Sequence, residues 1–385
     1  MKKNIKIIII SLITIAIISI FILIMTFNKK EKEIIEVEVY SEIKLSELIK
    51  NNEKILTENF YIDTTSLGEK EITYSYYDNN KKKNDSLFIK VVDKEKPYVM
   101  LGNIYTYVIG TKFNMENTVF CGDNVTKNPK KTIVGNYDLN KVGEYPLIFK
   151  VEDEFGNVNE KKFTLKVIEE KIPSKSSYIT FEELKNRLPN DASLMIDVSK
   201  WQADIDWKKV FESGIKYAML RLGTQKGVDL DSRIDEYFDK NIKEARANGI
   251  QVGVYYFTYA NDIHDAKEQA KWVVDVLKDY TLDLPVAFDW ECWDLFDEFN
   301  LNFYELNMIA DTFLKELEKE GYDTLLYGSK NYIENVWKYF SYDIWLAHYT
   351  KETSYQGEKM MWQFTSSGRI PGIKGNVDVN FYYNK

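Results

Sequence analysis

The stretch PVAFDWE, residues 285–291, joins a short apolar run to two acidic side chains. An apolar run without alternation is typical of a strand that is buried on both faces, as the strands of parallel sheets are. Asp289 and Glu291 stand at the end of this run, where such a strand would leave the core. The stretch therefore predicts a central strand that presents two carboxyl groups at its carboxyl end.

Similar apolar runs recur on both sides of this strand, and helical segments alternate with the earlier ones. Helical apolar periods cover 234–249, 265–280 and 302–321, whereas a late connection such as 365–376 has no helical period. Buried strands that alternate with helices are typical of a closed α/β barrel. We therefore expect an irregular TIM-like barrel over residues 191–385. Its expected strands are 194–199, 217–223, 251–257, 285–291, 324–329, 342–349, 359–365 and 377–383.

Acidic residues mark three of these strands. Asp197 belongs to the first, Asp289 and Glu291 to the fourth and Asp378 to the last. The first and last strands of a closed barrel are neighbours, so Asp197 and Asp378 should lie close together. Asp289 and Glu291 should share one face, and like charges at short range raise the pKa of one of the two groups. One protonated and one ionised carboxyl group is what glycoside hydrolysis requires.

Composition excludes several other chemistries. The chain has 385 residues, 60 Asp plus Glu against 51 Lys plus Arg, and a formal net charge of -9, so it has no overall basic field for binding nucleic acid. His264 and His348, with Cys121 and Cys292, are too few and too scattered for a zinc site or a Cys/His apparatus. We expect an enzyme that works with carboxyl groups and needs no metal or cofactor.

Aromatic residues provide candidate substrate contacts. All 8 tryptophans follow residue 200. Trp345, Ala347 and Tyr349 alternate along the expected sixth strand and would share one face. Aromatic rings offer flat apolar faces to sugars, although most are core residues. We predict that Tyr255, Tyr327 and Trp345 contact the substrate.

The N-terminus contains an apolar run of membrane-spanning length. Residues 7–27 carry no charge and have lysines on both sides. About 20 apolar residues match the hydrocarbon thickness of a bilayer. The run is longer than the apolar part of a typical signal peptide, and Asn28-Lys29-Lys30 follow where a cleavage site needs small residues. Residues 1–28 are thus predicted to be an uncleaved, single-pass transmembrane anchor, with the catalytic part extracellular on the cell-wall side.

Two small β domains are expected between the anchor and the barrel. Apolar and β-branched runs are separated by Gly, Asn and Asp clusters, and Asp78, Phe88 and Val92 align with Asp153, Phe163 and Val167 at one constant offset. The repeat predicts β domains at 29–95 and 96–169, before a linker at 170–190. The second resembles bacterial immunoglobulin-like modules, and no acidic or aromatic cluster is evident in the sequence of either. We therefore expect a spacer that performs no chemistry.

The barrel segment resembles glycoside hydrolase family 25, the muramidases or lysozymes of bacteria and phages. The resemblance runs in order from about residue 194 to residue 385. It implies a (β/α)5(β)3 barrel whose last three strands are antiparallel, and cleavage of the β-1,4 bond between N-acetylmuramic acid and N-acetylglucosamine in peptidoglycan. The stretches that carry it are MIDVSKWQADIDW (195–207), GVYYF (253–257), LPVAFDWE (284–291), LLYGS (325–329), IWLAHY (344–349), MWQFTSSG (361–368) and GNVDVNFY (375–382).

The resemblance also implies catalytic roles. Glu291 would be the general acid, and Asp289 would stabilise a developing positive charge or an oxazolinium formed by the substrate's own acetamido group. Asp197 and Asp378 would complete the site. Tyr256 departs from the family pattern, in which many members have a histidine there. An alternative is a catalytically inactive surface protein that uses the same barrel to bind the cell wall.

Overall fold

The structure, a computed structural model, describes residues 33–49, 54–78, 80–170, 177–225, 227 and 231–383. The chain forms two compact units, Met1–Lys94 and Glu95–Lys385. The predicted transmembrane anchor lies outside the described residues. Among the residues that are described, no helix has both the length and the apolar character that a membrane crossing requires.

The first unit is built on a four-stranded sheet with the order β1-β4-β3-β2. Its long hairpin joins β3 (Gly68–Asp78) to β4 (Lys81–Val92), and β1 (Ile34–Glu38) pairs with β4 in parallel. β1 and β2 (Lys54–Ile55) are the two edge strands, and the short helix α2 (Leu45–Leu48) buries both of its leucines. This single sheet is not the pair of facing sheets that an immunoglobulin-like domain has.

The second unit begins with another β domain, which we call the second β domain (residues 95–170). Its sheet, β6-β10-β9-β8, repeats the strand order of the first unit, with a parallel β6–β10 pair beside an antiparallel β9–β10 hairpin. The predicted repeat is thus visible as a repeated topology, whereas the immunoglobulin-like assignment again finds no support. The elements are β5 (Tyr98–Val99), β6 (Ile104–Val108), α3 (Met115–Thr118), β7 (Cys121–Gly122), β8 (Lys130–Val134), β9 (Gly143–Glu152) and β10 (Val158–Ile168), of which β5 and β7 form a separate two-stranded sheet.

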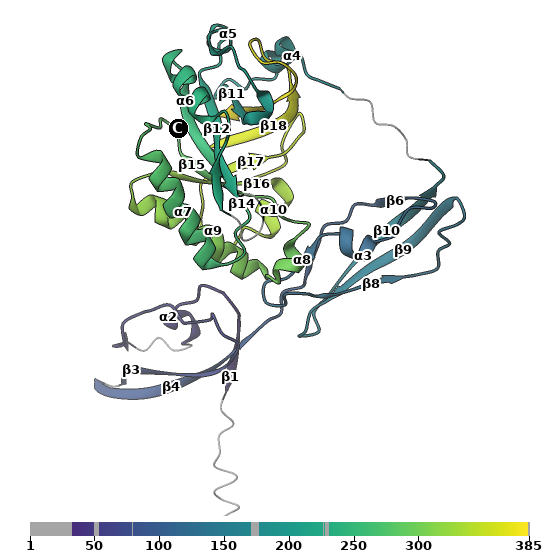
Figure 1. The fold of residues 1–385 in the computed structure, drawn as a ribbon. Helices are drawn as coiled ribbons and strands as arrows, with labels where there is room; N and C mark the ends of the chain where they lie inside the picture. The colour runs from purple at the N-terminus through teal and green to yellow at the C-terminus, as the bar shows by residue number, and fades with distance from the viewer. Residues whose placement is uncertain are drawn as a thin grey trace, which may run out of the picture. The chain divides into compact units, whose positions relative to one another are not determined.

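The remainder of the second unit is a closed barrel (Figure 1). It closes because β11 pairs with β12 on one side and with β19 on the other. A short strand, β13 (Ser232–Ile234), pairs in antiparallel fashion with the end of β12. Within described residues 177–383 the eight barrel strands are β11 (Ser193–Val198), β12 (Tyr217–Gln225), β14 (Gln251–Thr258), β15 (Val286–Trp290), β16 (Thr324–Ser329), β17 (Ile344–Ala347), β18 (Met361–Gly368) and β19 (Val377–Tyr382).

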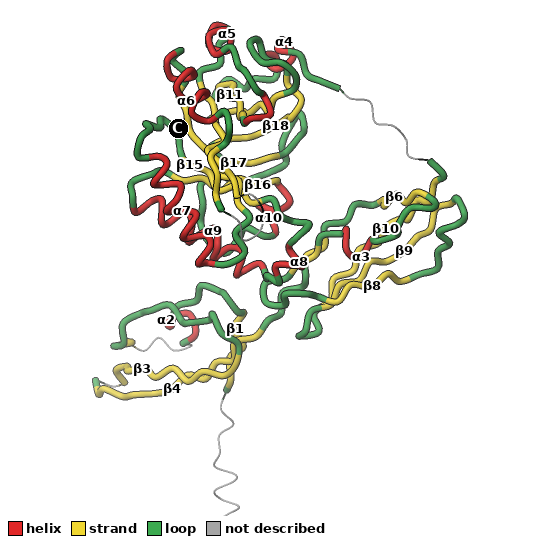
Figure 2. The backbone as a smooth tube through the Cα atoms, in the orientation of Figure 1, coloured by secondary structure: helices red, strands yellow, loops and turns green. Residues whose placement is uncertain are grey.

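Helices follow each of the first five barrel strands, as expected for (β/α)5(β)3. Asp262 and Asn302 cap α7 and α9 by accepting hydrogen bonds from backbone N–H groups of the first turn. Figure 2 shows these helices outside the strands. They are α5 (Trp207–Glu212), α6 (Phe238–Ala247), α7 (Ile263–Leu277), α9 (Phe303–Lys319) and α10 (Lys330–Asn335), with the short α8 (Phe296–Phe299) before α9.

The direction of the last strands corrects the expectation. β17 is parallel to β16, and β18 is parallel to β17, whereas β19 is antiparallel to both β18 and β11. The expectation of three antiparallel strands is therefore wrong for β17 and β18. A parallel connection requires about a dozen residues to return the chain. The segment 348–360 supplies that length without a helix.

Side chains along each barrel strand point alternately inward and toward the helices. The inward positions near the bottom of the barrel are apolar and include Met195, Met219 and Leu325, all fully buried. Gly253 makes room for them, since a Cβ atom there would lie 2.7 Å from the Met219 sulfur. The next inward positions along several strands are polar, and these form the candidate site.

The barrel body begins within the predicted linker. Ile179 donates its backbone N–H to the Ser367 carbonyl at 2.9 Å. Helix α4 (Phe181–Asn186) starts with a capping box between Thr180 and Glu183, and it buries Leu184 in the barrel core. Residues 179–186 are therefore part of the folded barrel.

Both cysteines are free and buried. Cys121 lies in β7 of the second β domain, and Cys292 follows Glu291 in the barrel. Burial raises the pKa of each thiol to about 12. Both residues thus serve as small apolar side chains.

Candidate active site

The four predicted acids converge at one rim of the barrel. Asp197 lies near the end of β11, and its register partner across the strand pair is Asp378. Because β19 is antiparallel to β11, Asp378 reaches this rim from the beginning of its strand. Asp289 lies in β15 and Glu291 directly after it. The predicted proximity of Asp197 and Asp378 is confirmed.

Asp197 and Asp378 form a hydrogen-bonded pair. Asp197 is buried, and its Oδ2 accepts hydrogen bonds from Asn380 Nδ2 at 2.7 Å and Gln363 Nε2 at 3.1 Å. Burial raises the pKa of Asp197 to about 6, although these donors oppose the rise. Burial and the charge of Asp197 raise the pKa of Asp378 to about 8. At neutral pH the pair therefore holds one proton, on Asp378.

Asp289 and Glu291 form a second pair with different surroundings. Asp289 is 4% exposed, whereas Glu291 is exposed. Burial, with the neighbouring Glu291 next in importance, raises the pKa of Asp289 well above its usual range. Desolvation by the protein around its carboxyl group raises the pKa of Glu291 as well, while its hydrogen bond with Asp289 acts in the opposite direction. Both shifts favour the protonated form of a carboxyl group in this pair.

Gln363 connects the acids to two tyrosines, and sequence reasoning missed this role. Its Nε2 donates to Asp197, and its Oε1 accepts hydrogen bonds from Tyr327 at 2.9 Å and Tyr349 at 2.8 Å. Its register partner is Asn380, the other donor to Asp197. An amide in the otherwise apolar run MWQF was the available signal, because a buried polar side chain needs partners.

Arg221 is a second group that the sequence analysis missed. Arg221 belongs to β12 and makes a buried ion pair with Asp235. The Asp235 Oδ2 atom lies 2.6 Å from Arg221 Nη2 and 2.7 Å from Arg221 Nε. Its positive charge lowers the pKa of Asp289, in opposition to burial. The signal was one arginine within the apolar strand YAMLRLG.

The three predicted substrate contacts meet inside the barrel. Trp345 is 2% exposed, its ring lies against Tyr255 and Tyr327, and its Nε1 donates to Asn380 Oδ1 at 2.7 Å. The Trp345 ring thus supports the floor beneath the acids, and sugar stacking on it stays a prediction. Tyr327 also borders the pocket beside Glu291.

Two pockets lie at the carboxyl ends of barrel strands. The first, of about 310 Å³, opens beside Glu291, in the size range of small-molecule sites. Its lining residues are Trp290, Glu291, Trp293, Tyr327, Gly328, Ser329, Lys330, Asn331, Tyr332, Ala347, His348 and Tyr349. The second, of about 470 Å³, lies over the ends of β12 and β14 and includes Arg221 and the 77% exposed Trp201.

Residues 196–373 match the sequence model of the family described as "Glycosyl hydrolases family 25". Escherichia coli proteins named YegX are 30% identical over 193 residues, which is 49% of this chain and 68% of the K12 protein. The chain belongs to glycosyl hydrolase family 25. It is accordingly a glycoside hydrolase, as its carboxyl groups predicted.

Solved structures similar to this family 25 chain include bacterial enzymes. The modular autolysin LytC of Streptococcus pneumoniae, in complex with a synthetic peptidoglycan ligand, is 24% identical at a TM-score of 0.44, over 61% of this chain and 56% of LytC. The Clostridium perfringens spore cortex lytic enzyme SleM is 23% identical at 0.45, over 51% and 69%. The Streptomyces coelicolor bacterial lysozyme is 21% identical at 0.41, over 51% and 94%.

Tyr256, which departs from the pattern of many family 25 members, lies outside the barrel interior. Its hydroxyl group is 2.6 Å from Ser232 Oγ, and its ring stacks on Phe313 of α9. Neighbouring Tyr255 points inward toward Trp345. Tyr256 therefore belongs to the layer between strands and helices, where its hydrogen bond has a partner.

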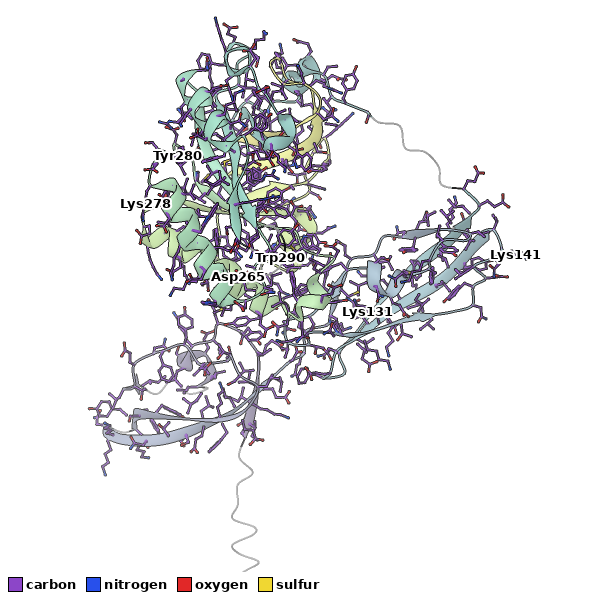
Figure 3. All side chains as sticks on the ribbon, viewed as in Figure 1. Lys131, Lys141, Asp265, Lys278, Tyr280 and Trp290 are labelled. Carbon is purple, nitrogen blue, oxygen red and sulfur yellow. The ribbon has the colours of Figure 1, made fainter. Side chains whose placement is uncertain are left out.

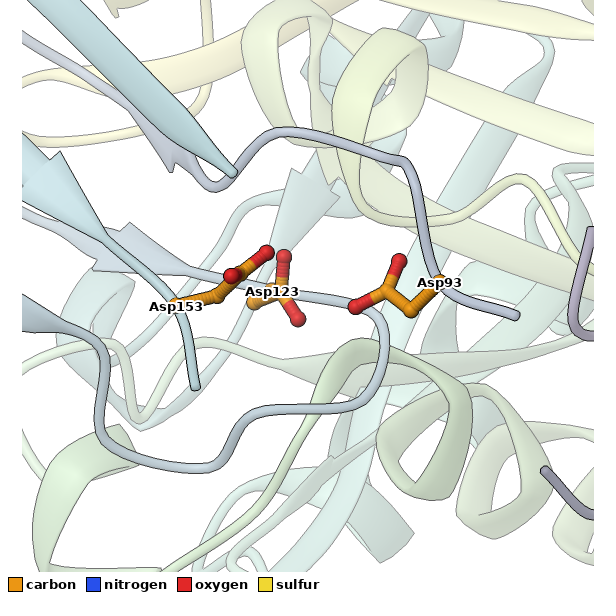
Figure 4. A group of neighbouring side chains, drawn as sticks. All are labelled: Asp93, Asp123 and Asp153. Atoms are coloured by element: carbon orange, nitrogen blue, oxygen red, sulfur yellow. The ribbon is translucent and has the colours of Figure 1, made fainter. Parts of the chain in front are cut away.

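A further group of acids lies in the second β domain. Asp123 and Asp153 are buried, and carboxylate oxygens of the two lie within 4.8 Å of each other, close enough to share a cation (Figure 4). Each also shapes a turn, because Asp123 accepts the N–H groups of Val125 and Thr126, and Asp153 those of residues 155 and 157. Figure 4 also labels Asp93, a residue of the first unit. The premise that this part of the chain has no acidic cluster is wrong.

Proposed function

We propose that the protein is a muramidase that hydrolyses the β-1,4 bond between N-acetylmuramic acid and N-acetylglucosamine in peptidoglycan glycan strands. The observation that carries the proposal is the Asp289–Glu291 pair. One carboxyl group is buried and the other opens into a pocket, and the raised pKa of both groups favours a proton on the pair. This is the acid and stabiliser combination that glycoside hydrolysis uses.

Glu291 is the general acid in this proposal. Its exposed carboxyl group can reach a glycosidic oxygen in the pocket, which the buried Asp289 cannot. A bound substrate would present its acetamido N–H to Asp289. The proton that Asp289 shares would then move to Glu291, which passes it to the leaving oxygen, while ionised Asp289 stabilises the oxazolinium formed by the acetamido group.

Asp197 and Asp378 supply a negative charge to the rim of the barrel in this proposal. With Asp378 protonated and Asp197 ionised, the rim carries a negative charge that favours a developing positive charge on the sugar. Gln363 and Asn380 hold the Asp197 carboxylate in place. The pocket beside Glu291 and the pocket over the ends of β12 and β14 offer room for a polymer that continues past the cleaved bond.

Digestion of purified peptidoglycan by the full-length chain, followed by mass spectrometry of the fragments, tests the proposal. We expect muramic acid at the new reducing ends and a β-configured first product by NMR, because substrate assistance retains the configuration. Glu291→Gln keeps the shape of the side chain and should lower the rate on the order of 10²-fold or more. Binding to the wall without release of reducing ends would instead favour the inactive wall-binding alternative, and an α-product would make Asp289 or Asp197 a base for water.

We further propose that the barrel lies on the cell-wall side of a membrane, anchored by the apolar residues 7–27. Protease added to intact, wall-stripped cells should then remove the barrel. Recovery of a soluble chain that starts near residue 30 from the medium would contradict this location.

A further inference from the structure

The second β domain and the barrel share an aromatic cluster. Phe120 precedes β7, and its ring centroid lies 5.3 Å from that of Trp293 and 5.2 Å from that of Tyr332, both in edge contact. The same ring contacts Phe296 at 5.4 Å and Phe303 at 6.1 Å. One side chain of the β domain thus meets four aromatic residues of the barrel.

The backbone of the β domain approaches the barrel closely at this contact. A Cβ atom on Gly122 would lie 2.3 Å from the Phe303 ring. The Phe303 N–H donates to the Asp123 carbonyl at 2.7 Å, and the Asn302 side chain donates to the Val125 carbonyl at 3.0 Å. These bonds attach the N-terminus of α9 to the loop after β7.

Ion pairs surround the aromatic cluster. Lys131 bonds to Asp297 at 2.6 Å with its side chain 13% exposed, and Lys127 bonds to Glu305 at 2.8 Å. Figure 3 labels Lys131 at this end of the β domain and Lys141 at the opposite end. The contact therefore combines an apolar centre with a charged rim, as stable protein interfaces do.

Two of the four barrel residues that meet Phe120, Trp293 and Tyr332, also line the pocket beside Glu291. Trp293 follows Glu291 by two residues, and Tyr332 lies on α10. Their rings are stacked, with centroids 3.5 Å apart and an interplanar angle of 5°. One wall of the pocket is thus a stacked pair whose edges rest on a residue from another domain.

We infer that the second β domain completes the catalytic cleft, with Phe120 as a positioning residue that holds the Trp293–Tyr332 stack where the glycan binds. The inference rests on the proposed function for the identity of the ligand. It replaces the expectation of a mere spacer for residues 95–170. Removing Phe120 should weaken substrate binding, since the stack loses its support, while Glu291 and Asp289 still perform the chemistry.

The test compares Phe120→Ala and Phe120→Leu with Phe113→Leu in the full-length protein. Phe113 is a matched control, because its ring contacts Tyr105, Tyr107 and Tyr137 within the β domain. With soluble glycan fragments as substrate, we expect Phe120→Ala to raise KM roughly 3- to 10-fold, the effect of losing about one aromatic pair, with kcat nearly unchanged. Phe120→Leu should have a smaller effect, and Phe113→Leu should leave KM unchanged.

An unchanged KM for Phe120→Ala overturns the inference, and so does an equal rise for Phe113→Leu, which would reflect general loosening of the domain. A fall in kcat alone would place the effect on the acids and also overturn it. If the wild-type protein releases no reducing ends, the proposed function fails separately. Hydrogen exchange of peptides from 291–300 and 330–337 then decides the inference, because only faster exchange in Phe120→Ala supports it.

Discussion

Replacing Asp378 with asparagine should stabilise the folded protein at neutral and alkaline pH. The pKa of this carboxyl group rises from 3.8 to about 8 in the fold. The folded state therefore holds a proton that the unfolded state releases, so the free energy of unfolding falls as the pH rises from about 4 through about 8. An asparagine at this position can donate the same hydrogen bond to Asp197 without binding a proton.

The size of the gain follows from the shift in pKa. Holding the proton at pH 7 against an unfolded pKa of 3.8 costs about 1.4 kcal/mol per pH unit, or about 4 kcal/mol in all. Asp378 is partly buried and shares its proton with Asp197, which reduces this figure. We expect Asp378→Asn to raise the free energy of unfolding by about 2–4 kcal/mol at pH 7 and by less at pH 5.

Urea denaturation followed by tryptophan fluorescence measures this gain. All 8 tryptophans lie after residue 200, so the signal reports on the barrel. Asp275→Asn on α7 is a suitable control, because its carboxyl group is 67% exposed and pairs with Lys278 at the surface. An equal gain at pH 5 and pH 7, or no gain at pH 7, would refute the assignment of the proton to Asp378.

Three further substitutions test other parts of the barrel. Gln363→Leu removes a donor to Asp197 and the acceptor of two tyrosine hydroxyl groups, so kcat should fall roughly tenfold, and an unchanged rate of reducing-end release would count against the Gln363 network. Arg221→Leu leaves Asp235 buried without its partner and should cost about 3–5 kcal/mol of stability in urea denaturation, with a smaller loss for Arg221→Lys. Gly253→Ala forces a Cβ atom against the Met219 sulfur and should cost about 1–3 kcal/mol; a neutral result would mean that the barrel floor can expand.

The barrel and its acids were predictable because each depends on a local pattern. Asp289 and Glu291 follow an apolar run, and closure of the barrel between its first and last strands places Asp197 beside Asp378. The direction of β18 was not predictable in the same way. The segment between β17 and β18 has no helical pattern. This fits either a parallel strand reached through a non-helical connection or an antiparallel strand, and the sequence does not distinguish the two until the path of residues 348–360 is known.

The supporting residues depend on contacts between distant segments, and such contacts leave little local signal. In the sequence Gln363 is only one amide within a strand, whereas in the fold it contacts Asp197 and two tyrosines. Phe120 lies 173 residues from Trp293 in sequence, and nothing near it indicates a partner. The immunoglobulin-like assignment stays unconfirmed for another reason, because a hairpin with a DEFGN turn fits several small β folds.

The buried thiols allow local opening of the β domain and of the barrel to be measured separately by chemical labelling. With a pKa of about 12, a thiol at pH 8 is in its reactive thiolate form about one time in ten thousand, so Cys121 and Cys292 are nearly inert while the protein stays folded. Each becomes reactive when its surroundings open, Cys121 in the β domain and Cys292 directly after Glu291 in the barrel. Labelling kinetics with a thiol reagent, resolved by peptide mass, therefore records how often either part of the molecule opens, without any engineered probe.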